Sequence, residues 1–135
     1  MTIVAGRIEV TKFGILERLK RLNYSHSEYW VVAGSAMVLH GLREATSDVD
    51  LGCTKALADI LESSGCKTAV LDDGTRKILV AEDVEIFENW LFDEVVIIEG
   101  IPVISLKGLL EMKKQLGRAK DIEDIKVIEA ALSKI

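Results

Sequence analysis

The stretch GSAMVLHGLREATSDVDLG, residues 34–52, constrains the fold of this chain more than any other segment. The residues before it are β-branched and aromatic, which predicts a buried strand over 28–34. A serine at the start of the next segment and a glycine near its end predict a short helix over 35–42. Alternating polar and apolar residues then predict a second strand over 46–53.

Two aspartates one residue apart, Asp48 and Asp50, lie in the second of these strands. Side chains alternate between the faces of a strand, so both carboxylates share one face at a separation of ~6–7 Å. They repel each other unless a cation lies between them, and hard oxygen ligands suit Mg²⁺ or Mn²⁺. The pair therefore predicts a metal site, with a solvent-facing pair as the alternative.

The Gly-Ser pair at 34–35 predicts a phosphate site beside that metal. Magnesium held by one or two carboxylates usually takes further ligands from substrate phosphates. Gly34 lets the backbone approach a phosphate without a Cβ clash, and a helix starting at Ser35 directs free N–H groups to the same place. The Ser35 hydroxyl adds a donor, so both residues are expected to bind nucleotide.

Gly-Ser followed by Asp-x-Asp resembles the signature of the nucleotidyltransferase superfamily, which has the polymerase-beta-like fold. The resemblance runs from about Tyr29 to Phe87, and more weakly through the last two helices. The sequence is similar to small single-domain members such as the lincosamide nucleotidyltransferases and abortive-infection-type toxins. The resemblance implies that Asp48 and Asp50 hold the metals that bind a nucleoside triphosphate. Haloacid-dehalogenase-type phosphatases also use Asp-x-Asp, but without the preceding Gly-Ser.

The resemblance also implies a third carboxylate on a later strand, which helps to activate the acceptor hydroxyl. Glu85 in DVEIFE is the candidate, as both catalytic residue and metal ligand. Its neighbours Val84 and Ile86 are apolar, so Glu85 faces the other side of the strand. The family usually has aspartate here. Glu82 and Asp83 are the alternatives.

Two basic residues are candidates for nucleotide binding. Arg43 lies between the two motifs, where it can reach a phosphate or orient Asp48. A surface salt bridge with Glu44 or Asp48 is the alternative for this residue. Lys120, in LGRAKDIEDI, resembles the basic residue that small members place near the triphosphate, although a charge-paired corner between helices explains it equally well.

Patterning in the remaining sequence predicts a single α+β domain over residues 1–135, with a mixed, twisted sheet of about five strands covered by helices. The metal site is expected at one edge of this sheet. The further predicted elements are helices over 11–23, 54–65, about 105–116 and 119–133, a hairpin over 66–71 and 75–81, and strands over 83–88 and 94–100, with 101–104 leading into the helices.

The composition excludes several classes of protein. A net charge of −5 argues against a broad nucleic-acid-binding surface. The apolar stretches are too short to cross a bilayer, and the N-terminal segment lacks the pattern of a signal peptide, so no membrane association is expected. Cys53 and Cys66 form no CxxC pair and are interpreted as reduced thiols. A cytoplasmic location is therefore predicted.

The predicted activity is transfer of a nucleoside monophosphate from an NTP to an acceptor hydroxyl, with release of pyrophosphate. The acceptor is left open between a small molecule, a tRNA end and a protein. A chain of 135 residues has little room for an acceptor domain, so a homodimer or a partner protein is a candidate to complete the cleft. The alternative is a non-catalytic nucleotide-binding or toxin-antitoxin partner protein that retains the fold.

Overall fold

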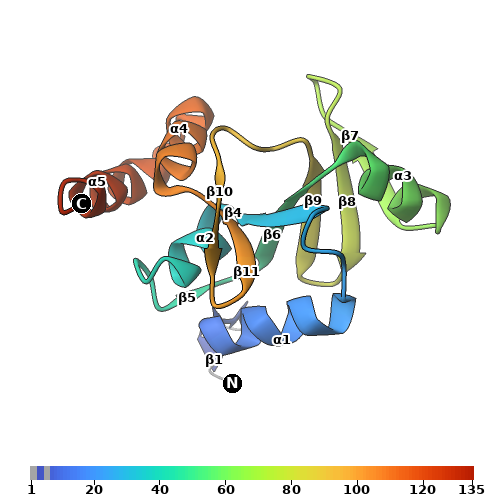
Figure 1. Cartoon of the computed structure of the whole chain (residues 1–135), viewed down its shortest axis with the longest axis horizontal. Coiled ribbons are helices and arrows are strands. Elements are labelled where there is room, and N and C mark those ends of the chain that lie inside the picture. Colours follow the sequence, from blue (N-terminus) through green and yellow to red (C-terminus); the bar gives the residue numbers. More distant parts are fainter. Residues whose placement is uncertain (1–2, 5–6) are drawn as a thin grey trace.

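The computed structural model describes residues 3–4 and 7–135, and its centre is a mixed sheet of seven strands in the order β10-β11-β4-β6-β9-β8-β7 (Figure 1). The pairs β11–β4 and β6–β9 are parallel, and the other neighbours are antiparallel. The strands are β4 (Tyr29–Val32), β6 (Val49–Cys53), β7 (Lys67–Val70), β8 (Arg76–Ala81), β9 (Val84–Glu88), β10 (Val95–Ile98) and β11 (Ile101–Ile104).

The sheet has more strands than the predicted five, partly because residues 101–104 form a strand of their own, β11, between β10 and β4. Strands β10 and β11 are joined by a two-residue turn in which Glu99 has φ 51° and Gly100 has φ 78°. Positive φ at both central residues matches the twist of a hairpin. The sequence analysis missed this turn because Glu99 is not a usual turn residue.

Two short ribbons accompany the main sheet. Strands β1 (Ile3–Val4) and β2 (Arg7–Ile8) pair with each other, and β3 (Val10–Thr11) pairs with β5 (Ala45–Thr46). The segment predicted as one strand over 46–53 is therefore divided by a bend at Ser47 and Asp48. Asp48 lies immediately before β6, whereas Asp50 lies within it.

Helices cover the sheet much as predicted, with Thr11, Thr54 and Ser105 capping three of them through side-chain oxygens. Helix α2 is the exception, since it begins two residues before Ser35 and its N-cap, Val32, provides no side-chain hydrogen bond. The helices are α1 (Lys12–Leu22), α2 (Ala33–Leu39), α3 (Lys55–Ser63), α4 (Leu106–Leu116) and α5 (Asp121–Leu132). No helix among the described residues is long and apolar enough to cross a membrane.

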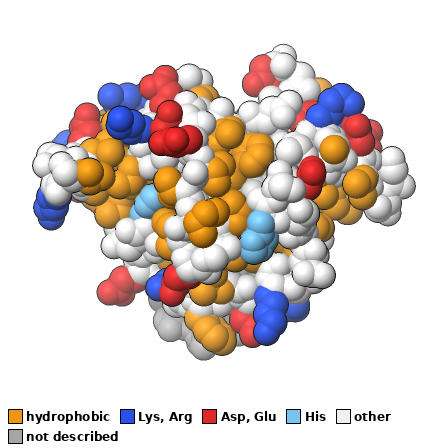
Figure 2. Space-filling model, viewed as in Figure 1, with side chains coloured by type: hydrophobic (Ala, Val, Ile, Leu, Met, Phe, Trp, Pro, Cys, Tyr) orange, Lys and Arg blue, Asp and Glu red, His pale blue; other side chains and the backbone are white. Residues whose placement is uncertain are grey.

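One hydrophobic core lies between the sheet and the helices. Every residue of β4 is buried, and Leu51, Ile86 and Ile104 are fully buried on the neighbouring strands. In Figure 1, α1 crosses below the sheet, α3 lies beyond β8, and α4 and α5 lie on the opposite side. Figure 2 shows apolar side chains gathered in the middle of this view, with most charged side chains around the rim.

Candidate active site

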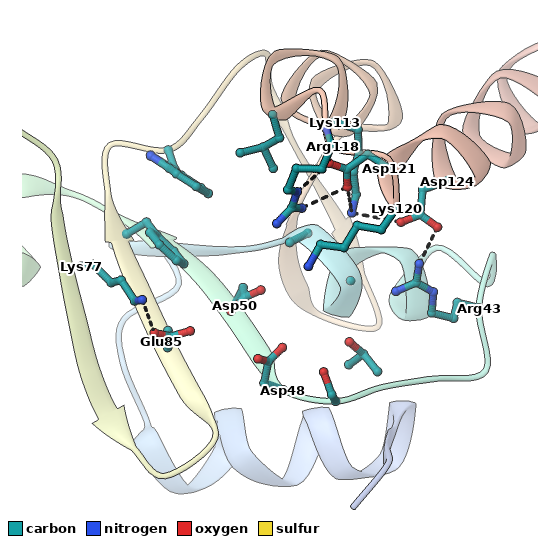
Figure 3. Close-up of a pocket in the computed structure, with 17 residues that line it drawn as sticks. Arg43, Asp48, Asp50, Lys77, Glu85, Lys113, Arg118, Lys120, Asp121 and Asp124 are labelled. Carbon is teal, nitrogen blue, oxygen red and sulfur yellow. Dashed lines mark hydrogen bonds and ion pairs between the residues drawn. The ribbon is translucent and has the colours of Figure 1, made fainter. Parts of the chain in front are cut away.

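Three carboxylates converge where β6 and β9 lie side by side. Asp50 is aligned with Glu85 in this parallel pair, and Asp48 lies just before β6. One carboxylate oxygen from each of the three residues lies within 4.8 Å of the others. The sequence analysis selected these three residues, and the structure brings them together on one face of the sheet (Figure 3).

The electrostatics of this acidic triad are unfavourable for Asp50. Burial, followed by repulsion from the Asp48 and Glu85 carboxylates, raises the pKa of Asp50 from 3.8 to about 7. The Lys77 ammonium on β8 lies 3.0 Å from a Glu85 oxygen and offsets part of the negative charge. Three carboxylate oxygens this close together are the hard ligands that a divalent cation prefers.

The alternative third carboxylates lie elsewhere. Arg18 on α1 donates to Asp83 from Nε at 2.9 Å and contacts the same oxygen from Nη2 at 2.7 Å. Asp83 and Arg18 line a separate pocket. Glu82 is exposed in the turn before β9. The register between β6 and β9 aligns Glu85 with Asp50, whereas Glu82 and Asp83 lie in the turn before β9.

Gly34 lines the same cleft at the turn from β4 into α2. The preceding residue, Ala33, has φ 55°, a left-handed conformation that costs a non-glycine residue roughly 1–2 kcal/mol. A Cβ added to Gly34 would lie 2.6 Å from Thr46 Oγ1 and 3.0 Å from Arg43 Nη1. Glycine is therefore required here by packing, in addition to any approach of a phosphate to the backbone.

Ser35 lies beside the cleft but does not line it, and its side chain is fully buried. Its hydroxyl donates to the Val32 carbonyl at 2.9 Å and accepts from the Asp50 amide at 3.1 Å. These contacts join the start of α2 to the strand that carries Asp50. The phosphate contact expected from the Ser35 hydroxyl stays a prediction, because the hydroxyl is occupied by the backbone in this structure.

Basic residues from α4 and from the corner between α4 and α5 form the opposite wall of the cleft, together with two aspartates of α5 (Figure 3). Lys113 is 4% exposed and lies 3.2 Å from an Asp121 oxygen and 3.0 Å from an Asp124 oxygen. Arg118 donates to both Asp121 oxygens, at 2.7 and 3.0 Å. The sequence analysis missed Lys113 and Arg118, because only the fold brings this helical corner opposite the triad.

The two basic residues predicted from the sequence both line this cleft, with different partners. Arg43 forms an ion pair with Asp124, and not with Glu44 as one interpretation proposed. Lys120 is exposed, and its side chain extends toward the middle of the cleft in Figure 3. Among the described residues Lys120 has no ion pair, so its charge is available to a ligand.

The cleft has a volume of about 490 Å³ and contains three kinds of surface: the triad, the basic wall and an apolar end. The apolar end is made by Phe87 on β9 and Trp90 after it, and Leu116 on α4 is a further apolar residue of the lining. Neither aromatic residue was predicted to belong to the site. A cleft with a divalent-metal ligand set facing several cations can bind a polyphosphate and act on it.

Comparison with known proteins gives the fold. No protein-family model and no curated protein matches the sequence. The structure is similar to the crystal structure of ANT(2")-Ia in complex with adenylyl-2"-tobramycin, with 17% identity and a TM-score of 0.54, over 87% of this chain and 85% of that chain. It is also similar to a "putative nucleotidyltransferase" from Thermotoga maritima, with 17% identity and a TM-score of 0.51, over 89% of this chain and 95% of that chain. The predicted nucleotidyltransferase fold is confirmed.

Proposed function

We propose that this protein transfers a nucleoside monophosphate from an NTP to an acceptor hydroxyl and releases pyrophosphate. The convergence of Asp48, Asp50 and Glu85 beside Gly34 carries the proposal. The fold supports it, because one of the compared proteins with this fold was solved in complex with adenylyl-2"-tobramycin. The cytoplasm remains the proposed location, which agrees with two free cysteines.

The acidic triad fits a divalent cation by its donor chemistry. Asp48, Asp50 and Glu85 would hold Mg²⁺ or Mn²⁺, since three carboxylate oxygens this close need a positive charge among them. When bound, the cation would supply neutralisation of charge on the transferred phosphoryl group. The raised pKa of Asp50 supports the assignment, because a cation would remove the repulsion that helps to raise it.

The basic wall is the proposed site of the triphosphate. Arg118 and Lys120 lie on the helical corner opposite the triad, and Arg43 lines the side nearest Gly34. Asp121 and Asp124 hold Lys113, Arg118 and Arg43 in place through ion pairs. Cations fixed before the substrate arrives stabilise phosphoryl charge without reorganisation during the reaction.

Glu85 is the proposed acceptor of the proton from the attacking hydroxyl. Its carboxylate is part-exposed at the cleft, and Lys77 holds one of its oxygens at 3.0 Å. A carboxylate fixed within reach of an acceptor hydroxyl typically contributes a factor of ~10²–10⁴ to the rate. Glutamate in place of the family's usual aspartate is compatible with this role, because Glu85 is aligned with Asp50 in the sheet.

A small molecule with a free hydroxyl is the acceptor we favour over a tRNA end or a protein. The net charge of −5 disfavours nucleic acid, and the structure bound to adenylyl-2"-tobramycin belongs to a protein with this fold. Completion of the cleft by a second copy or a partner protein stays part of the proposal. The second candidate function is a non-catalytic nucleotide-binding protein, which a misplaced Glu85 would have favoured.

Calorimetric titration with each NTP, with and without Mg²⁺, tests binding, and pyrophosphate release tests the reaction. Wild-type protein should bind an NTP only when Mg²⁺ is present. Asp50→Asn should abolish this metal-dependent binding. Glu85→Gln should keep binding nearly intact but slow pyrophosphate release by a factor of ~10²–10⁴. Asp83→Asn is the matched control, because Asp83 is a carboxylate of the same segment that lines another pocket. Metal-independent binding, or full activity of Glu85→Gln, would contradict the proposal.

A further inference from the structure

An aromatic pair lines one end of the cleft that holds the acidic triad. The rings of Phe87 and Trp90 are stacked, with centroids 4.2 Å apart and planes 12° apart. Both residues line the cleft and both are partly exposed. Ligand pockets are commonly lined by aromatic side chains, and this pair keeps part of its surface open to the cleft.

Contacts of Trp30 and Gly52 with this part of the sheet position the aromatic pair. The indole Nε1 of Trp30 donates to the Trp90 carbonyl at 2.7 Å, which fixes the backbone of Trp90. Trp30 can lie there because Gly52 has no side chain: a Cβ at Gly52 would be 2.1 Å from Trp30 Nε1. Phe87 is aligned with Gly52 in the sheet. The fold therefore sets the backbone positions of both residues before any ligand binds.

The triad lies between this aromatic pair and the turn at Gly34. Asp50 is aligned with Val32 on one neighbour and with Glu85 on the other, and the chain passes from Val32 into the Gly34 turn. Phe87 lies two residues beyond Glu85 on the same face of β9, or about 6.6 Å along the strand. Along β6 and β9 the surfaces therefore follow in this order: the turn at Gly34, the carboxylates of the triad, and the aromatic rings.

We infer that Phe87 and Trp90 form a stacking site for the nucleobase of the NTP. The inference rests on the proposed function, in which the triphosphate lies between the triad and the basic wall. An NTP carries an anionic tail and a flat aromatic ring at opposite ends, and the cleft provides Arg43 beside Gly34 on one side of the triad and the rings on the other. Leu116 on α4 provides a further apolar contact at the cleft.

Stacking on a π-face accepts every base, so this site binds all four NTPs rather than reading one by hydrogen bonds. Loss of one aromatic partner from a base typically lowers affinity by roughly five- to a hundredfold. The competing occupant of the rings is a cyclic acceptor molecule. The two occupants differ in one respect that can be measured: only a nucleobase makes the affinity for the NTP itself depend on Trp90.

The test compares Mg²⁺-ATP with Mg²⁺-tripolyphosphate, which has the anionic tail without the base, by calorimetry on the full chain. Wild-type protein should bind ATP more tightly than tripolyphosphate. Trp90→Leu should weaken ATP roughly tenfold and leave tripolyphosphate unchanged, and Trp90→Phe should recover most of the loss. Phe87→Leu is the second variant, for the case in which Trp90→Leu does not fold.

Intrinsic fluorescence provides an independent measurement. The chain has two tryptophans, of which Trp30 is 8% exposed, so ATP but not tripolyphosphate should change the emission, and Trp90→Phe should abolish that change. An unchanged ATP affinity in Trp90→Leu would overturn the inference and assign the rings to the acceptor. An equal loss of affinity for ATP and for tripolyphosphate in Trp90→Leu would also overturn the inference, because it would show that Trp90 has only a structural role. Failure of wild-type protein to bind either ligand would reject the proposed function as well.

Discussion

The two walls of the cleft both contain clustered carboxylates, but the clusters have opposite electrostatics. The helical wall is the basic wall described above, with the two aspartates of α5. There Arg118, followed by Lys113, lowers the pKa of Asp121 from 3.8 to about 2. The sheet wall is the surface of β6 and β9 that carries the acidic triad. There burial, followed by repulsion from Asp48 and Glu85, raises the pKa of Asp50 to about 7. Asp121 and Asp124 have three basic partners within the fold, whereas the triad has Lys77 at its edge.

This difference in electrostatic environment distinguishes carboxylates that stabilise the fold from carboxylates whose negative charge favours binding of a cation. A buried carboxylate with its counter-ions in place is satisfied by the protein and needs nothing further. Repulsion between neighbouring carboxylates, which helps to raise the pKa of Asp50, is relieved when a cation binds among them. Regions that cost stability in the absence of a ligand are typical of binding and catalytic sites.

The largest effect on stability is expected from the helical wall. Lys113→Met keeps most of the side-chain volume but leaves the fully buried Asp121 and the mostly buried Asp124 without their shared cation. Removal of one partner from a buried ion pair typically costs about 3–5 kcal/mol, and we expect about 3 because Arg118 and Arg43 remain. Urea denaturation measures the loss.

Lys114→Met on the same helix is the matched control. Lys114 is half-exposed and its Nζ lies 4.0 Å from a Glu129 oxygen, so its loss should cost less than about 1 kcal/mol. Similar losses from both variants would mean that the helical wall is not held by its buried charges, and the contrast between the two walls would fail.

The next largest effect concerns the pH dependence of the metal-free protein. Because the folded-state pKa of Asp50 lies above its ordinary value, the folded state holds this proton more tightly than the unfolded state. This contribution to stability is fully present below about pH 3.8 and is lost as pH rises through about 7. The free energy of unfolding in EDTA should therefore fall between about pH 5 and pH 8 by a few kcal/mol.

Asp50→Asn should remove most of this pH dependence and make the metal-free protein more stable than wild type at pH 8. Saturating Mg²⁺ should also flatten the wild-type curve, because a bound cation replaces the proton. The charged groups that act on Asp50 are Asp48, Glu85, Lys113 and Lys77. A variant less stable than wild type at pH 8 would show that Asp50 stabilises the fold.

The sheet wall was largely predictable from the sequence, because its residues obey the local rules of strands. Asp48 and Asp50 lie in one short stretch, and the alternation along β9 selected Glu85. The pairing of β6 with β9 was not predictable, because strand order depends on packing between distant segments. Even within this wall, the bend at Asp48 and the buried Ser35 hydroxyl depart from the simple strand and helix of the sequence analysis.

The helical wall and the aromatic end could not have been assigned from the sequence. Lys113 reads as one of several lysines on an amphipathic helix, and only its burial against α5 distinguishes it. Phe87 and Trp90 read as apolar residues of a strand and a loop. Their position follows from the contact between Trp30 and Gly52, which are 22 residues apart and meet only after β4 and β6 pair.

The smallest expected effect concerns Lys77, which provides the triad with an ion-pair partner inside the fold. Its pair with Glu85 is partly exposed, at 40% for Lys77 and 27% for Glu85, and such pairs contribute about 0.2–1 kcal/mol. A metal must replace this contact, so Lys77→Gln should tighten Mn²⁺ binding by up to about fivefold, measured by calorimetry without nucleotide. Lys67→Gln, on the exposed edge strand β7, controls for the change in net charge and should have little effect. Weaker Mn²⁺ binding in Lys77→Gln would show that Lys77 positions Glu85 for the metal rather than competing with the metal. The sheet wall would then resemble the helical wall, because a basic side chain of the fold would hold its carboxylate in place.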